Sequence, residues 1–140
     1  MFSKILVGVD GSDTALHAAK VAAQLAETTQ AELHVISAVD DTAPVSTGGE
    51  FGDGRTLTPG EIAEAIANQV AGQLEVSTTV HTGPRAGKPA EALVDVAREI
   101  DADLIVVGNR RVQGIGRVLG SVARGVAQHA PCDVYVVKTH

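Results

Sequence analysis

Apolar residues in this chain fall into five short runs, and the segments between them carry apolar residues at helical spacing. The clearest run, residues 5–9, reads ILVGV and is continuous, as expected of a strand buried on both faces. The third run is favoured by its β-branched residues. Together the runs predict strands at 5–9, 31–37, 76–82, 103–108 and 133–138.

Four helices are predicted between these strands from capping residues and apolar spacing. Ser12 is an N-cap candidate for the first helix, and Thr58 with Glu61 has the sequence of a capping box for the second. Pro89 begins the third helix, and the fourth covers 120–129. The inner stripe expected for the second helix is Ile62, Ala65, Ile66, Gln69 and Val70.

Strands and helices therefore alternate from end to end, which is typical of an α/β domain. Right-handed crossovers predict an open, five-stranded parallel sheet, doubly wound, with helices on both faces. The pattern alone does not give the strand order. Residues 1–140 are expected to form a single domain. Residues 39–57 are rich in Asp, Gly, Ser, Thr and Pro and lack periodicity, so we expect a flexible loop there.

Composition narrows the functional classes. The chain has one cysteine, Cys132, which excludes an intramolecular disulfide. We expect a cytoplasmic protein, because no signal-peptide pattern and no run long enough for a membrane span is found. The formal net charge of −6 disfavours nucleic acid as a partner. Residues 104–140 nevertheless hold five basic side chains and one acidic, which suits a small anion or is simply a solvated surface.

The Gly- and Arg-rich segment 108–121 is the best candidate for binding that anion. It joins the end of a predicted strand to the start of a predicted helix, where backbone N–H groups and the helix dipole favour phosphate. Such segments also occur as plain connectors. It is not a Walker loop, because the Gly-Lys-Ser/Thr ending is missing.

Three segments resemble the universal stress protein family. They are Val9-Asp10-Gly11-Ser12, Gly87-Lys88-Pro89, and 107–122 followed by 129–134, which reads HAPCDV. The resemblance covers essentially the whole chain. It implies the strand order 3-2-1-4-5, a nucleotide crevice between strands one and four, and an adenine nucleotide as ligand.

Carried over residue by residue, the resemblance implies that Asp10 lies at the adenosine end and that the backbone at Val35 meets the adenine. It places Gly108 at the first loop glycine and the turn 120–122 at the phosphates. The complete predicted nucleotide-binding set is Val9, Asp10, Val35, Val107, Gly108, Asn109, Arg110, Arg111, Gly114, Gly116, Arg117, Gly120, Ser121 and Val122.

The loop departs from the family's ATP-binding pattern at one glycine. Arg111 stands at its second glycine, and the spacing to Gly120 is one residue short. An arginine in place of this glycine either moves the loop or blocks the phosphate. Alternatively, the side chains of Arg110, Arg111 and Arg117 replace the phosphate contact that the lost glycine amide no longer makes, and the sequence does not choose between these outcomes. Three functions stay open: a sensor that binds ATP, AMP or a cyclic nucleotide; a nucleotide-free interaction protein; and a slow Mg²⁺-dependent ATPase. No catalytic residues are predicted, and an enzyme is the less favoured interpretation.

Two further expectations concern metals and partners. The histidines are scattered over separate elements without a ligand motif, so no metal site is predicted. The resemblance makes the last strand a sheet edge, and its apolar residues predict a homodimer formed through that edge. The residues expected at the dimer interface are Val134, Val136 and Val137.

Overall fold

The computed structural model describes residues 2–39, 50–51, 55–110 and 119–139. Five parallel strands form one sheet in the order β5-β2-β1-β6-β7. Their bounds are β1 Lys4–Gly8, β2 Glu32–Val39, β5 Val80–Ala86, β6 Leu104–Arg110 and β7 Asp133–Thr139. Counting these five strands along the chain gives the order 3-2-1-4-5, which confirms the expected topology.

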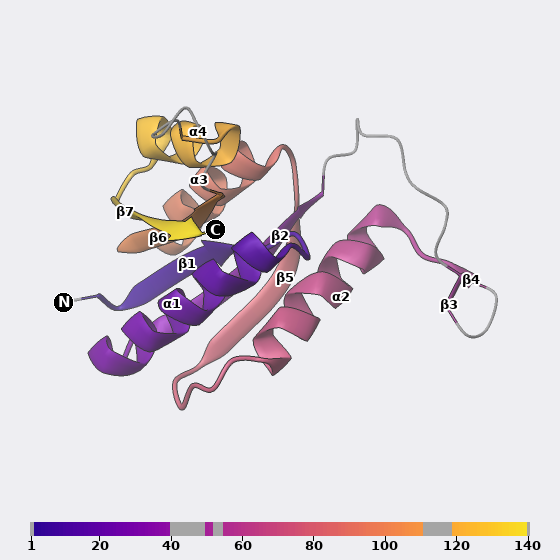
Figure 1. Cartoon of the computed structure of the whole chain (residues 1–140), viewed down its shortest axis with the longest axis horizontal. Helices are drawn as coiled ribbons and strands as arrows, with labels where there is room; N and C mark the ends of the chain where they lie inside the picture. The colour runs from indigo at the N-terminus through magenta and orange to yellow at the C-terminus, as the bar shows by residue number, and fades with distance from the viewer. Residues whose placement is uncertain (1, 40–49, 52–54, 111–118, 140) are drawn as a thin grey trace.

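Four helices cover the two faces of the sheet (Figure 1). They are α1 Asp13–Thr29, α2 Pro59–Gly72, α3 Pro89–Ile100 and α4 Ser121–His129. Helices α1 and α2 lie on one face, and α3 and α4 lie on the other. The winding reverses between β1 and β6. The connections that leave the carboxyl ends of these two strands therefore run to helices on opposite faces of the sheet, which leaves a crevice between them. No helix in the described part of the chain is long and apolar enough to cross a membrane.

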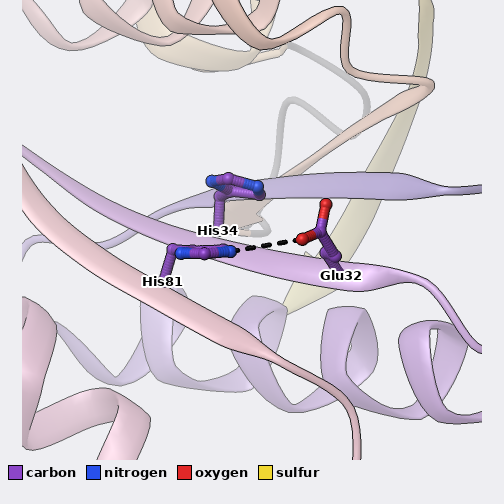
Figure 2. Close-up of side chains that lie close together, drawn as sticks. All are labelled: Glu32, His34 and His81. Atoms are coloured by element: carbon purple, nitrogen blue, oxygen red, sulfur yellow. Dashed lines mark hydrogen bonds and ion pairs between the residues drawn. The ribbon is translucent and has the colours of Figure 1, made fainter.

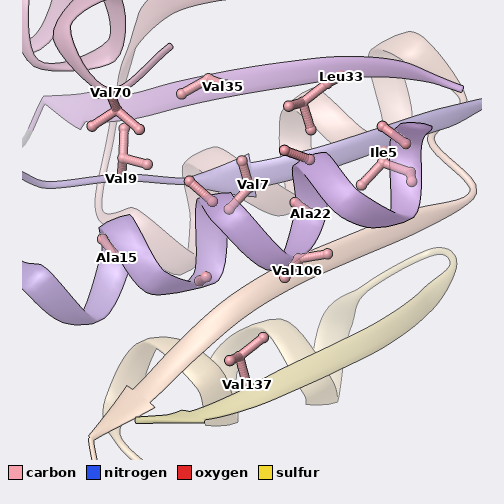
Figure 3. Close-up of a cluster of buried hydrophobic side chains, with 14 of the residues drawn as sticks. Ile5, Val7, Val9, Ala15, Ala22, Leu33, Val35, Val70, Val106 and Val137 are labelled. Atoms are coloured by element: carbon pink, nitrogen blue, oxygen red, sulfur yellow. The ribbon is translucent and has the colours of Figure 1, made fainter. Parts of the chain in front are cut away.

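The core under α1 consists of small residues on the helix and branched residues on the sheet (Figure 3). Ala15 and Ala22 face Ile5, Val7 and Val106, all buried. Alanine lets the helix axis approach the sheet closely, and branched side chains fill the pleated surface without cavities. This close approach sets where the N-terminus of α1 lies relative to the strand ends.

The third strand of the sheet begins four residues later than predicted, at Val80 instead of residue 76. Residues 76–79 include three β-branched residues, but the Glu27 carboxylate of α1 holds Ser77 in a loop. It accepts hydrogen bonds from the Ser77 backbone N–H at 2.8 Å and the Ser77 hydroxyl at 2.6 Å. The strand then continues past residue 82, where the predicted strand ends, and includes Pro84. Proline is tolerated there because β5 is an edge strand.

The inner stripe of α2 also differs from the prediction. The buried residues are Ala63, Ala67 and Val70, whereas Ala65 and Gln69 are exposed. The bulky isoleucines of this helix suggested a stripe centred on them. Instead small alanines face the sheet and let the helix pack closely, with the isoleucines half-buried at the margin.

Residues 39–57 contain regular structure that their composition did not predict. Val39 ends β2, and a two-residue antiparallel ladder joins β3 (Glu50–Phe51) to β4 (Arg55–Thr56). Residues 40–49 and 52–54 of the expected flexible loop lie outside the described residues.

Strand β7 forms one edge of the sheet, as expected. One of the three valines predicted at the dimer interface is already buried without a second copy of the chain. Val137 is 5% exposed and packs within its own chain. Val134 and Val136 are half-buried against the α3 and α4 side of the core. The most exposed large apolar side chain on the described surface is Tyr135, at 46%.

Candidate functional site

A cleft of about 150 Å³ lies at the carboxyl ends of the central strands, where the winding reverses. Strands β1, β2 and β6 and the first turns of α1, α3 and α4 all contribute to it. Its walls are mostly apolar. The lining residues are Gly8, Val9, Asp10, Ser12, Thr14, Ala15, Ile36, Ala38, Pro89, Ala92, Leu93, Val107, Gly108 and Val122.

The turn between β1 and α1 places an exposed carboxylate at the rim of this cleft. The Oδ1 atom of Asp10 accepts a hydrogen bond from the Ser12 backbone N–H at 2.9 Å. Gly11 adopts φ +87°, a left-handed conformation that favours glycine. Ser12 in turn caps α1, its hydroxyl oxygen accepting from the Ala15 N–H at 3.1 Å. One Asp10 oxygen is thus used to hold the turn, and the other is available to a ligand.

Gly108 brings β6 and the start of α1 into direct contact beneath the cleft. A Cβ atom at this position would lie 2.8 Å from the Thr14 backbone oxygen and 2.8 Å from its methyl carbon. Any side chain would therefore push α1 away from the sheet. The glycine has a packing role whether or not a ligand approaches it.

Asn109 connects the end of β6 to the start of α4. Its Oδ1 atom accepts a hydrogen bond from the backbone N–H of Gly120, the N-cap of α4, at 2.7 Å. The first turn of α4 therefore lies beside the β6 end, with Val122 on the cleft wall. Backbone N–H groups at a helix start are unpaired within the helix and favour negative charge.

The cleft thus offers three kinds of contact in one place. Its apolar walls suit a flat ring, the Asp10 carboxylate accepts hydrogen bonds from hydroxyls, and the start of α4 attracts an anion. A ligand that combines a flat ring, hydroxyl groups and a negative charge matches these contacts. In an open parallel sheet, ligands are expected to bind where the strand order reverses.

The universal stress protein family matches residues 1–138. The chain belongs to this family. It is similar to universal stress protein MJ0531 of Methanocaldococcus jannaschii, with 36% identity over 99% of this chain and 83% of the relative. It is also similar to YxiE of Bacillus subtilis, with 32% identity over 99% of this chain and all of the relative.

Solved structures of the universal stress protein family share the fold. One of them, a universal stress protein in complex with cAMP, is 32% identical with a TM-score of 0.70 and 99% coverage of both chains. UspA from Lactobacillus plantarum is 30% identical with a TM-score of 0.70 and 97% coverage of both chains.

In this universal stress protein, five of the predicted nucleotide-binding residues line the cleft. They are Val9, Asp10, Val107, Gly108 and Val122. Asn109, Gly120 and Ser121 lie beside it at the end of β6 and the start of α4. The Arg110 backbone ends β6, and Arg111, Gly114, Gly116 and Arg117 lie outside the described residues.

The prediction for Val35 concerns its backbone, and its side chain does not line the cleft. It is fully buried on the α1 side of the sheet, because strand residues alternate between faces. Its neighbour Ile36 and then Ala38 line the cleft instead. The sequence analysis did not predict that α3 contributes Ala92 and Leu93 to the cleft. In a parallel sheet the helices that follow the strands all begin at the same edge, so the start of α3 could have been included.

A second group of polar side chains, Glu32, His34 and His81, comes together on β2 and β5 (Figure 2). The two histidines are directly paired in the strand register, and their rings stack with centroids 4.5 Å apart. Burial, and secondarily the neighbouring His81, lower the pKa of His34 below its usual value. The expectation that the histidines are scattered is therefore wrong for this pair.

The cysteine has the environment of an unreactive thiol. Cys132 is partly buried, and burial, followed by the nearby Asp133 carboxylate, raises the pKa of its thiol. A raised pKa leaves little thiolate near neutral pH.

Proposed function

We propose that this protein binds an adenine nucleotide in the cleft between β1 and β6 and acts as a nucleotide-dependent regulator of a stress response. The observation that carries the proposal is the combination, in one cleft, of apolar walls, the Asp10 carboxylate and the start of α4. A family member of 32% identity has been solved in complex with cAMP, which supports an adenine nucleotide as the ligand class.

The proposed orientation follows from the chemistry of each part of the cleft. The adenine ring would lie against the apolar wall that includes Ile36 and Ala38, where burial of a flat ring is favourable. The ribose hydroxyls would donate to Asp10. The phosphates would then point toward the backbone N–H groups that begin α4, at Gly120 and Ser121.

Among adenine nucleotides, we propose ATP. The segment 110–117 contains three arginines, and their charge suits a triphosphate better than the single negative charge of a cyclic nucleotide. We propose binding without appreciable turnover, because hydrolysis needs a positioned water and cations directed at the γ-phosphate. A slow Mg²⁺-dependent ATPase and a nucleotide-free interaction protein are the outcomes that would replace this proposal.

The test is calorimetric titration of the full chain with ATP, with and without Mg²⁺, and with AMP and cAMP in parallel. Two variants probe the cleft. Asp10→Asn keeps an oxygen for the Ser12 N–H but removes the charge, and Ala38→Phe fills the wall. The matched control is Ala65→Phe, which adds the same side chain at an exposed position on α2.

We expect micromolar ATP binding that Ala38→Phe weakens by about tenfold or more, whereas Ala65→Phe leaves it unchanged. Asp10→Asn should weaken the binding of every nucleotide that carries the ribose hydroxyls. Stronger binding of cAMP than of ATP would replace the choice of nucleotide while keeping the site. Absence of heat with all three nucleotides would refute the proposal and favour the nucleotide-free alternative.

We also propose that the protein is a cytoplasmic homodimer joined through β7. The edge position of β7, its half-buried Val134 and Val136 and the exposed Tyr135 support pairing with a second copy. A single partly buried thiol is compatible with a reducing compartment. Val136→Lys should convert a sedimenting dimer into monomers, whereas an unchanged dimer would place the interface elsewhere.

A further inference from the structure

The group of Glu32, His34 and His81 is assembled by strand register, on a part of the sheet away from the strand-order reversal. His34 of β2 pairs with His81 of β5, and Glu32 lies two residues before His34 on the same face of β2. Each side chain offers one metal-ligating atom, and these atoms all lie within 4.8 Å of one another. Figure 2 shows the stacked rings and the Glu32 carboxylate directed toward His81.

The spacing of these atoms is close to that of a metal site. The Nε2 atom of His81 lies 3.3 Å from Oε1 of Glu32. Two ligands of a tetrahedral zinc ion, each about 2.0–2.1 Å from the metal, are separated by roughly 3.3 Å. The His34 ligand atom lies within 4.8 Å of the other two. Because an imidazole nitrogen donates its lone pair in the plane of its ring, at least one of the two stacked rings must rotate out of the stack for both histidines to bind one ion.

The second observation is a buried nitrogen without a partner. The Nε2 atom of His34 is buried, and no hydrogen-bond partner is found for it within the described parts of the chain. A buried polar atom left unsatisfied costs free energy, so native proteins rarely keep one without a reason. Coordination of a cation through the Nε2 atom of His34 would remove that cost.

We propose that Glu32, His34 and His81 bind one Zn²⁺ ion. Two imidazoles and a carboxylate are a donor set that zinc accepts, whereas Mg²⁺ and Ca²⁺ prefer oxygen ligands alone. The side chains of His81 and Glu32 are 49% and 42% exposed, so an ion reaches them from solvent and water completes the coordination. The proposal is independent of the nucleotide proposal.

In the described part of the chain, the positive charge of Lys4 acts on this group. Lys4 pairs with Glu32 in the strand register, but its ammonium donates to the backbone carbonyl of Ile100 at 3.0 Å. The Glu32 carboxylate is oriented toward His81 instead. Bound zinc would connect β2 to the edge strand β5, on the sheet face where Ile36 lines the cleft.

The experiment is calorimetric titration of the tag-free, full-length protein with Zn²⁺, without nucleotide, and with Mg²⁺ as the comparison ion. The variants are His34→Gln, His81→Gln and Glu32→Gln. The matched controls are His129→Gln, an exposed histidine on α4, and Cys132→Ser, which removes the thiol. Circular dichroism confirms folding of each variant, and nitrogen-detected NMR of the imidazoles locates the ion.

We expect one Zn²⁺ per chain and no Mg²⁺ binding, with Zn²⁺ shifting the imidazole signals of His34 and His81. Loss of either histidine should weaken Zn²⁺ binding by at least about tenfold, and the two controls should leave it unchanged. If His34→Gln disturbs the fold, the exposed His81 and Glu32 give the same test. Absent Zn²⁺ binding, or equal affinity in His81→Gln, would overturn the proposal.

Discussion

The cleft and the Glu32–His34–His81 group are built in opposite ways. The cleft is made mainly from apolar side chains on strand ends and helix starts at one edge of the sheet, and Asp10 is the one carboxylate among its described lining residues. The other group is made from three polar side chains on neighbouring strands, one of which is the sheet edge. The first exists because of how the chain winds, and the second because of which residues happen to share a register.

This difference predicts different sensitivities to substitution. Residues at the cleft hold the fold together as well as the candidate ligand, as the contact of Gly108 with Thr14 shows. In the histidine group the side chains of His81 and Glu32 are 49% and 42% exposed, so substitutions at these two residues should cost little stability. Stability measurements in the absence of any ligand can therefore separate the two regions.

The largest effect is expected at Gly108. Gly108→Ala places a Cβ 2.8 Å from the Thr14 backbone oxygen, so α1 must move, at a cost of about 1–3 kcal/mol in the free energy of unfolding. Gly83→Ala is the matched control in strand β5, where a Cβ would meet no atom within 4 Å. Urea unfolding of both variants measures the difference. Equal stability of the two would show that α1 does not depend on this contact.

A smaller effect is expected at Asn109. Asn109→Ala removes the acceptor for the Gly120 N–H and should lower the unfolding free energy by about 1 kcal/mol. Asn109→Asp keeps that acceptor, so it should recover the stability. The added negative charge should nevertheless weaken ATP binding. Thermal unfolding and calorimetry of the pair distinguish the two roles, and identical losses in both variants would contradict this assignment.

The smallest effect is expected at His81. Without metal, His81→Gln should change the unfolding free energy by about 0.5 kcal/mol or less, since a solvent-exposed side-chain contact of this kind is weak. Chemical denaturation in the presence of a chelator measures this value. When the measurement is repeated with Zn²⁺, the ion should stabilise the unsubstituted protein but not the His81→Gln variant. A large loss in chelator would mean that the group serves the fold itself.

Sequence reasoning gave the fold class, all five strands of the sheet and all four helices because these depend on local pattern. Its errors had tertiary causes. The third strand was misplaced because Glu27, distant in sequence, holds Ser77 in a loop. The stripe on α2 was misassigned because side-chain size suggested a different face from the one that packs closely.

The two candidate sites differ in the same respect. The ends of β1 and β6 carry conspicuous local sequence, so Asp10 and Gly108 could be predicted together once the strand order was known. His34 and His81 are 47 residues apart in the sequence, and only the register of β2 with β5 makes them neighbours. A pattern search along the chain contains no signal for such a pair.

The most direct test of nucleotide binding is an amide NMR titration of the full chain with ATP. The account predicts that the largest shifts occur in the turn 10–12, at Gly108 and Asn109, and at 120–122, with smaller changes on β5. Shifts confined to β7, or none at saturating ATP, would contradict it.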